Sequence, residues 1–192
     1  HVTISQNVSS GNVEENGGRG GGMFLISSNP TLTNVTISEN MASNNGGGMS
    51  LTYSNPTLTN ITISQNVSSQ NGGGMMVSGS NPTLTDVTIS ENTAMTGGGM
   101  SIASSYPDLT HVTISENMAS NDGGGMYLTN SNPTLTNVTI SGNTANDDGG
   151  GMHLWHSNPF LTHVSISGNL ANDDGGGMYL YASDPTLIHV TI

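Results

Sequence analysis

The chain has 192 residues, with 13 Asp and Glu against a single Lys or Arg, and a formal net charge of −12. A surface this acidic repels a phosphate backbone, so the composition excludes a nucleic-acid partner. The absence of cysteine excludes disulfides and thiolate metal sites, and no apolar run approaches the roughly 18 residues that a membrane span requires.

A repeat extends over the whole chain. It is marked by prolines 25 or 26 residues apart: Pro30, Pro56, Pro82, Pro107, Pro133, Pro159 and Pro185. A period of this length predicts a solenoid in which each repeat forms one coil, and we expect one continuous domain over residues 1–192. Because residues 1–4 and 189–192 both read His-Val-Thr-Ile, we interpret the chain as an internal fragment of a longer array.

Within each repeat, apolar and polar residues alternate over short runs, which is typical of half-buried strands. In the second repeat the expected strands cover residues 31–33 and 35–38 and a third run beginning at Met49, with bends at Asn34 and Asn40. Three glycines precede the third run and permit positive φ and close backbone approach. The fold class predicted is all-β, a right-handed parallel β-helix of about seven coils of 26 residues with three short strands per coil.

Equivalent positions of the repeats form columns when the coils are superposed. We predict a buried ladder of side-chain amides from the column Asn7, Asn40, Asn66, Asn92, Asn117, Asn143 and Asn169. Two irregularities interrupt the period. Extra residues after Asn7 predict a protruding loop over residues 11–19, with Glu14, Glu15 and Arg19, and one residue is missing between Asn92 and Gly97.

Aromatic residues gather on the third run of the later repeats. Tyr127, His153 and Tyr179 share one outward column, and Trp155 and Tyr181 lie two residues further along. Exposed rings of this kind stack on sugar faces or bury against another molecule, so we predict that these five residues bind a ligand. The alternative is that rings of neighbouring coils stack on one another and stabilise the sheet.

Aspartates also gather in the later repeats. Asp122, Asp148 and Asp174 form a column before the glycines, and Ca²⁺ bound between coils would relieve the repulsion of these carboxylates. The alternative is a solvated acidic turn, since Asn45, Asn71 and Thr96 hold the same position earlier. The neighbouring Asp147 and Asp173 are the carboxylate pair available to a glycosidase, but their place in a repeating turn argues against catalysis. We predict no catalytic residues, and no cofactor is required beyond this candidate calcium site.

Outward threonines form paired columns on the first run, as at Thr31 and Thr33 or Thr57 and Thr59. Flat threonine arrays of this spacing resemble ice-binding β-solenoids. Asp108, Phe160 and Ile188 interrupt the array, and threonine is favoured on any exposed strand. Ordinary threonine ladders are therefore the alternative.

Two recurring steps carry a family resemblance over the whole chain. An aliphatic residue is followed three positions later by Asn, as from Ile37 to Asn40, and a Gly-Gly-x-aliphatic step follows. This pairing resembles the repeats of chlamydial polymorphic outer-membrane proteins and similar right-handed β-helix regions of bacterial and archaeal surface proteins. Those repeats carry Phe-x-x-Asn and Gly-Gly-Ala-Ile, where this chain has Ile-x-x-Asn and Gly-Gly-Gly-Met. The resemblance implies an exported β-helix used in surface display, adhesion or fibre building, with an extracellular or cell-surface location.

The expected function is a non-enzymatic structural or adhesive segment of an exported surface or filament protein. An ice-binding β-solenoid is the first alternative, and a polysaccharide-binding or polysaccharide-active β-helix is the second. The expected partners are further copies of the chain, associated end to end through strand edges or laterally, and a glycan or a host or cell-surface molecule.

Overall fold

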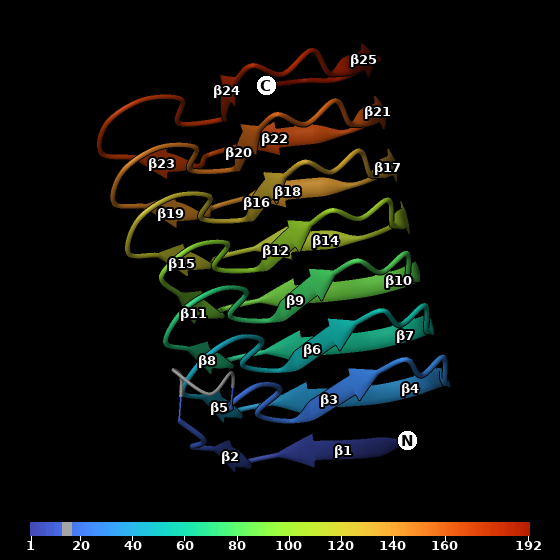
Figure 1. Ribbon diagram of the computed structural model, residues 1–192. Coiled ribbons are helices and arrows are strands. Elements are labelled where there is room, and N and C mark those ends of the chain that lie inside the picture. Colours follow the sequence, from blue (N-terminus) through green and yellow to red (C-terminus); the bar gives the residue numbers. More distant parts are fainter. Residues whose placement is uncertain (13–16) are drawn as a thin grey trace.

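The computed structural model describes residues 1–12 and 17–192, and within them the secondary structure is strand, turn and bend without helix. The coils stack along one axis, with the two termini at opposite ends of the stack (Figure 1). Glu14 and Glu15 of the predicted loop lie outside the described residues.

Three parallel sheets run along the stack. The first contains β1 (Val2–Ser5), β4 (Thr31–Ser38), β7 (Thr57–Ser64), β10 (Thr83–Ser90), β13 (Asp108–Thr110), β14 (Thr113–Ser115), β17 (Thr134–Thr136), β18 (Thr139–Ser141), β21 (Phe160–Thr162), β22 (Ser165–Ser167) and β25 (Thr186–Ile188). The second contains β2 (Val8–Ser9), β5 (Met41–Ala42), β8 (Val67–Ser68), β11 (Thr93–Ala94), β15 (Met118–Ala119), β19 (Thr144–Ala145) and β23 (Leu170–Ala171). The third contains β3 (Met23–Ile26), β6 (Met49–Thr52), β9 (Met75–Ser78), β12 (Met100–Ala103), β16 (Met126–Thr129), β20 (Met152–Trp155) and β24 (Met178–Tyr181).

The all-β class, the parallel stacking and the three sheets confirm the prediction, but the strand boundaries differ from it. In the second coil the two runs expected on either side of Asn34 form one strand, β4, although Asn34 takes a left-handed φ of 57°. In the later coils the equivalent runs are separate strands, as predicted, for example β13 and β14 on either side of His111. The second sheet is made instead by two-residue strands such as β5. A run of two residues is too short to show an alternating pattern, so no periodic signal in the sequence marks these strands.

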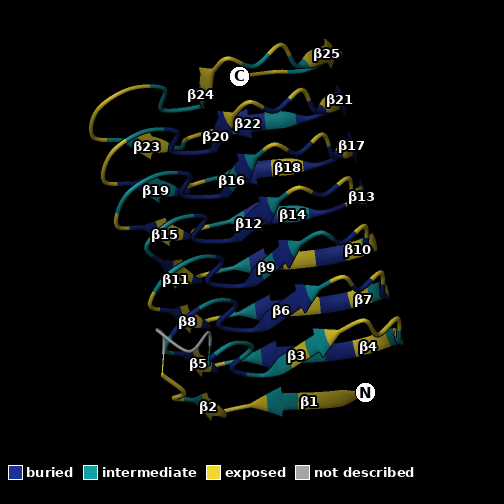
Figure 2. Cartoon of the chain, in the orientation of Figure 1, coloured by how far each residue is buried: buried dark blue, intermediate teal, exposed yellow. Residues whose placement is uncertain are grey.

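The core consists of columns of identical or similar apolar residues. Ile37 pairs in register with Ile63, and Met49 with Met75, so each inward side chain lies directly above its counterpart. In the middle coils these side chains are fully buried, as at Leu84, Ile89 and Met100 (Figure 2). Burying a side chain of this size contributes about 1.5–3 kcal/mol, and the repeat places several of them in every coil.

The predicted ladder of buried amides is confirmed. The Nδ2 group of Asn66 donates to Oδ1 of Asn92 at 3.0 Å, and Asn92 donates to Asn117 at the same distance. The backbone N–H of each Asn donates to the same oxygen, as from Asn66 to Asn92 at 2.9 Å. The ladder therefore satisfies the buried polar groups while it joins each coil to the next.

A second ladder, which the sequence analysis did not predict, follows the third sheet. It consists of serines two residues before the prolines, which are buried from Ser54 to Ser157. The backbone N–H of Ser54 donates to Oγ of Ser80 at 2.8 Å. Ser80 donates in turn to Ser105 at 2.9 Å. The recurrence of serine at this position in every repeat is the signal from which the sequence could have predicted the ladder.

The glycine triplets have the two predicted roles. Gly46 has a φ of 71°, and a Cβ atom at Gly47 would lie 2.4 Å from the carbonyl oxygen of Gly73 in the next coil. The turns of successive coils therefore approach too closely for a side chain. The residue missing before Gly97 is absorbed between β11 and β12, because both strands pair in register with the following coil.

Candidate binding face on the third sheet

The outer face of the third sheet carries most of the candidate ligand-binding residues. Alternation along each strand turns Met152 and Leu154 of β20 into the core and leaves His153 and Trp155 on the outer side. Register pairing then places Tyr127, His153 and Tyr179 in one column and Trp155 and Tyr181 in a second. The structure thus brings together the five residues that the sequence predicted to share this face.

The first column is a continuous stack of rings. His153 lies between Tyr127 and Tyr179, with ring centroids 4.9 and 4.8 Å apart and planes inclined by 19° and 22°. His153 is only 4% exposed, whereas the sequence analysis expected an exposed ring. The flanking tyrosines cover both of its faces, so its own faces are closed to a ligand.

The second column is more open. Trp155 and Tyr181 stack with centroids 4.1 Å apart and planes within 9° of parallel, and they remain 38% and 45% exposed. His156 packs edge-on against both rings, at 5.5 and 5.7 Å. Sequence reasoning missed His156, which occupies a corner with a left-handed φ of 49°. The three rings form a partly exposed aromatic patch.

The same face is hollow in the second and third coils, where Ser50 and Met76 stand in the column that the rings occupy later. Ser50 and Ser78 lie there with Met76 and Arg19, and they line a hollow of about 240 Å³ together with Asn45 and Thr52. The sequence placed Arg19 in a protruding loop, whereas the structure places it at this hollow. The hollow lies between exposed apolar residues of β3, Phe24 and Ile26, and the aromatic surface of the later coils.

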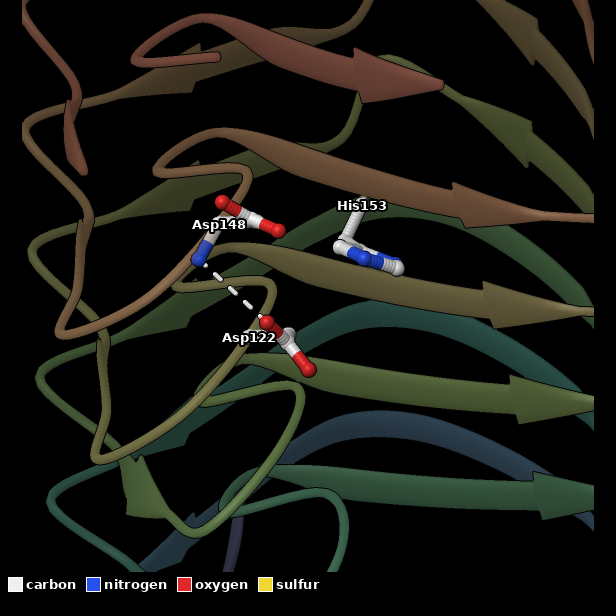
Figure 3. Close-up of side chains that lie close together, drawn as sticks. All are labelled: Asp122, Asp148 and His153. Carbon is white, nitrogen blue, oxygen red and sulfur yellow. Dashed lines mark hydrogen bonds between the residues drawn. The ribbon is translucent and has the colours of Figure 1, made fainter. Parts of the chain in front are cut away.

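The acidic turn adjoins the aromatic column. The backbone N–H of Asp148 donates to Oδ1 of Asp122 at 3.3 Å, and that of Asp174 to Oδ1 of Asp148 at 2.9 Å, so the predicted column exists. Asp122, Asp148 and His153 each place a ligand atom within 4.8 Å of the others (Figure 3). Asp174 is exposed and lies outside this cluster. The third member of the cluster is therefore His153, which the sequence analysis assigned to the aromatic face, and not Asp174.

Burial and charge act in opposite directions on the pKa of His153 and in the same direction on that of Tyr127. Burial lowers the pKa of His153, and the negative charges of Asp122 and Asp148 oppose this effect. The pKa of Tyr127 is raised, first by burial and then by the charge of Asp122. The neutral imidazole is therefore the favoured form of His153, with one ring nitrogen carrying a free lone pair.

The other candidates lie apart from this face. Asp147 and Asp173 are exposed on the outer turn, where the backbone N–H of Asp173 donates to the carbonyl oxygen of Asp147 at 3.2 Å. The threonine columns occupy the outer side of the first sheet, with Thr57 paired to Thr83 and both exposed. Over the residues that the structure describes, no helix has the length and apolar character needed to cross a membrane.

Comparison with known proteins extends these findings. Comparison with curated proteins gave no match. The family model described as "Right handed beta helix region" matches residues 1–171, which is most of the chain, and agrees with the right hand predicted for the coil. The coil architecture and this match together show that the chain belongs to the right-handed β-helix family.

Proposed function

We propose that the chain is a non-enzymatic structural and adhesive segment of an exported surface or filament protein. The observation that carries the proposal is the continuity of the stack. Three parallel sheets and the Asn ladder join every coil to the next, so the segment forms a stiff rod whose outer faces present the same positions at regular intervals. Such a rod suits display and contact more than chemistry at one point.

Two features of the surface support a contact role over catalysis. The chain has a single Lys or Arg, whereas enzymes that cleave acidic polysaccharides on β-helices use basic groups to stabilise developing negative charge. The second feature is that Asp147 and Asp173, the carboxylate pair available to a glycosidase, lie in a turn that repeats along the stack. A repeating structural turn is a poor place for a unique catalytic pair. An extracellular or cell-surface location and a kinship with polymorphic outer-membrane-protein repeats belong to the same proposal.

The partner that we propose is a glycan. Trp155 and Tyr181 present a stacked, partly exposed pair of rings held in place by His156, and aromatic rings of this kind bind the apolar faces of sugars. The alternative partner is a second copy of the rod, which would associate laterally through the same aromatic patch.

A glycan array tests this proposal. Wild-type protein is expected to bind a subset of neutral glycans, and Trp155→Ala and Tyr181→Ala are each expected to abolish that binding. Tyr106→Ala is the matched control, because Tyr106 is an aromatic residue, 56% exposed, outside the patch.

Binding that survives both substitutions would remove the aromatic patch from the proposal. Sedimentation of the same variants distinguishes lateral association, because dimers lost on Trp155→Ala would indicate a second rod as the partner. Release of reducing sugar ends from polysaccharides, abolished by Asp147→Asn or Asp173→Asn, would overturn the non-enzymatic assignment.

A further inference from the structure

We propose that Asp122, Asp148 and His153 form a binding site for a divalent first-row transition-metal ion, with Zn²⁺ the best match. The three residues come from adjoining coils. Asp122 and Asp148 lie on successive glycine turns, and His153 lies on β20, which follows the second turn. Their ligand atoms lie within 4.8 Å of one another, on the same outer side of the coils (Figure 3).

In the earlier coils, the position of the acidic column is held by residues with side-chain hydrogen-bond donors, which the later coils lack. These donors bridge the coils: Nδ2 of Asn71 donates to Oδ1 of Asn45 at 3.0 Å, and the hydroxyl of Thr96 donates to Asn71. Asp122 and Asp148 have no such donor when ionised. The backbone N–H groups described above engage one oxygen of each carboxylate. A cation between these coils would replace the bridging donor and offset the repulsion between the charges.

His153 provides an independent observation. Its side chain is 4% exposed, and its Nδ1 atom is buried without a hydrogen-bond partner. A buried polar atom left unsatisfied is costly, and such atoms in native structures call for an explanation such as a bound ion. Stacking between Tyr127 and Tyr179 holds the ring beside the two carboxylates, so the unpartnered nitrogen belongs to an imidazole that is held next to both of them.

The ligand set selects the class of ion. Ca²⁺ takes six to eight oxygen ligands, whereas two carboxylates and one imidazole are typical ligands for Zn²⁺ and related ions and leave a position for water. Zn–ligand bonds of about 2.0–2.2 Å hold ligand atoms roughly 3.4 Å apart. Binding therefore draws the three groups closer together. The carboxylates lie on half-buried turns, whereas the imidazole is fixed in the stack, so the carboxylates supply that movement.

Calorimetric titration of chelator-treated protein with Zn²⁺ tests the site. We expect a single equivalent to bind, with affinity reduced at least about tenfold by Asp122→Asn, Asp148→Asn or His153→Phe. The phenylalanine keeps an aromatic ring between the two tyrosines, so this variant removes the nitrogen while it preserves the stack. Asp174→Asn is the control, because it neutralises the next carboxylate of the same column, which lies outside the cluster, and keeps the backbone N–H that Asp174 donates to Asp148.

The absorption spectrum of the Co²⁺ form gives a second readout, because a nitrogen ligand and a low coordination number produce intense visible bands that His153→Phe is expected to weaken. Three results would overturn the proposal: no Zn²⁺ binding by the wild type, unchanged affinity in His153→Phe, or tighter binding of Ca²⁺ that Asp174→Asn abolishes. The last would establish the carboxylate column itself as a calcium site.

Discussion

The side-chain amide of Asn92 donates to Oδ1 of Asn117 at 3.0 Å, and the same Nδ2 group also donates to the carbonyl oxygen of Ile63 at 3.0 Å. Its own Oδ1 accepts from both the backbone and the side chain of Asn66. A single fully buried side chain thus satisfies groups in three consecutive coils. The ladder is therefore as much a part of the core as the apolar columns beside it.

Asn92→Ala is expected to lower the free energy of unfolding by roughly 3 kcal/mol or more, because it leaves several buried donors and acceptors without partners. Thr93→Ala, at the neighbouring exposed position, is expected to cost no more than about 0.5 kcal/mol. Chemical denaturation followed by circular dichroism measures both. Equal losses in the two variants would show that the ladder contributes no more than a surface position.

The glycine turns support a second prediction. A Cβ atom at Gly98 would lie 2.5 Å from the carbonyl oxygens of Gly124 and Met118. These are backbone atoms of the next coil, so the clash cannot be relieved by a side-chain rotation. Gly98→Ala is expected to cost about 3 kcal/mol or more, at the upper end of overpacking effects.

The matched control for that substitution is Gly142→Ala. Gly142 has a left-handed φ of 64°, but a Cβ atom at this position would meet no clash, since its nearest neighbour would lie at an ordinary contact distance of 3.6 Å. Only backbone strain of about 1–2 kcal/mol opposes this substitution. Thermal unfolding of the two variants should therefore rank Gly98→Ala as the more damaging, and the reverse order would argue against close approach as the reason for the triplets.

A third prediction concerns the bend before the Asn ladder. Glu116 has a left-handed φ of 57°, and the equivalent position in the next two coils is occupied by Gly142 and Gly168. Glu116→Val is expected to lower the free energy of unfolding by about 1 kcal/mol or more, because a β-branched residue is poorly tolerated there. Glu116→Gly is expected to be nearly neutral, because relief of strain offsets the greater entropy of the unfolded chain. Denaturation midpoints that fall equally for both variants would contradict this account.

The repeat period made the coil predictable from the sequence. A spacing that places Ile37 above Ile63 and Asn66 above Asn92 leaves few architectures other than a parallel stack, and core and ladder follow from it. The two-residue strands such as β5 were not predictable, because two positions carry no period. Their pairing is a consequence of the stack and not of a local preference.

The sequence could predict which site residues share a column, but not which columns lie close together. The sequence placed Tyr127, His153 and Tyr179 in one column, and register pairing confirms that arrangement. It could not show that His153 lies against Asp122 and Asp148, because the separation of two columns depends on how the glycine turn folds back on the strand. The burial of His153 depends on the same packing.

The outer side of the first sheet supports the last prediction, which concerns ice binding. Thr57 and Thr83 are exposed and in register, as an ice-binding array would require, but Asp108 follows in the same column and Phe160 replaces threonine further along. A charged group and a bulky ring, the latter 43% exposed, interrupt the regular surface that would match an ice lattice.

Solutions of the wild-type chain are therefore expected to show no thermal hysteresis beyond that of an equal concentration of an unrelated protein, as measured by nanolitre osmometry. The double variant Asp108→Thr, Phe160→Thr serves as the comparison, because it restores an uninterrupted threonine column along the coils of the same protein. Hysteresis in the wild type would establish ice binding in place of the proposed contact role. Hysteresis confined to the double variant would show that the two interruptions alone prevent this threonine face from binding ice.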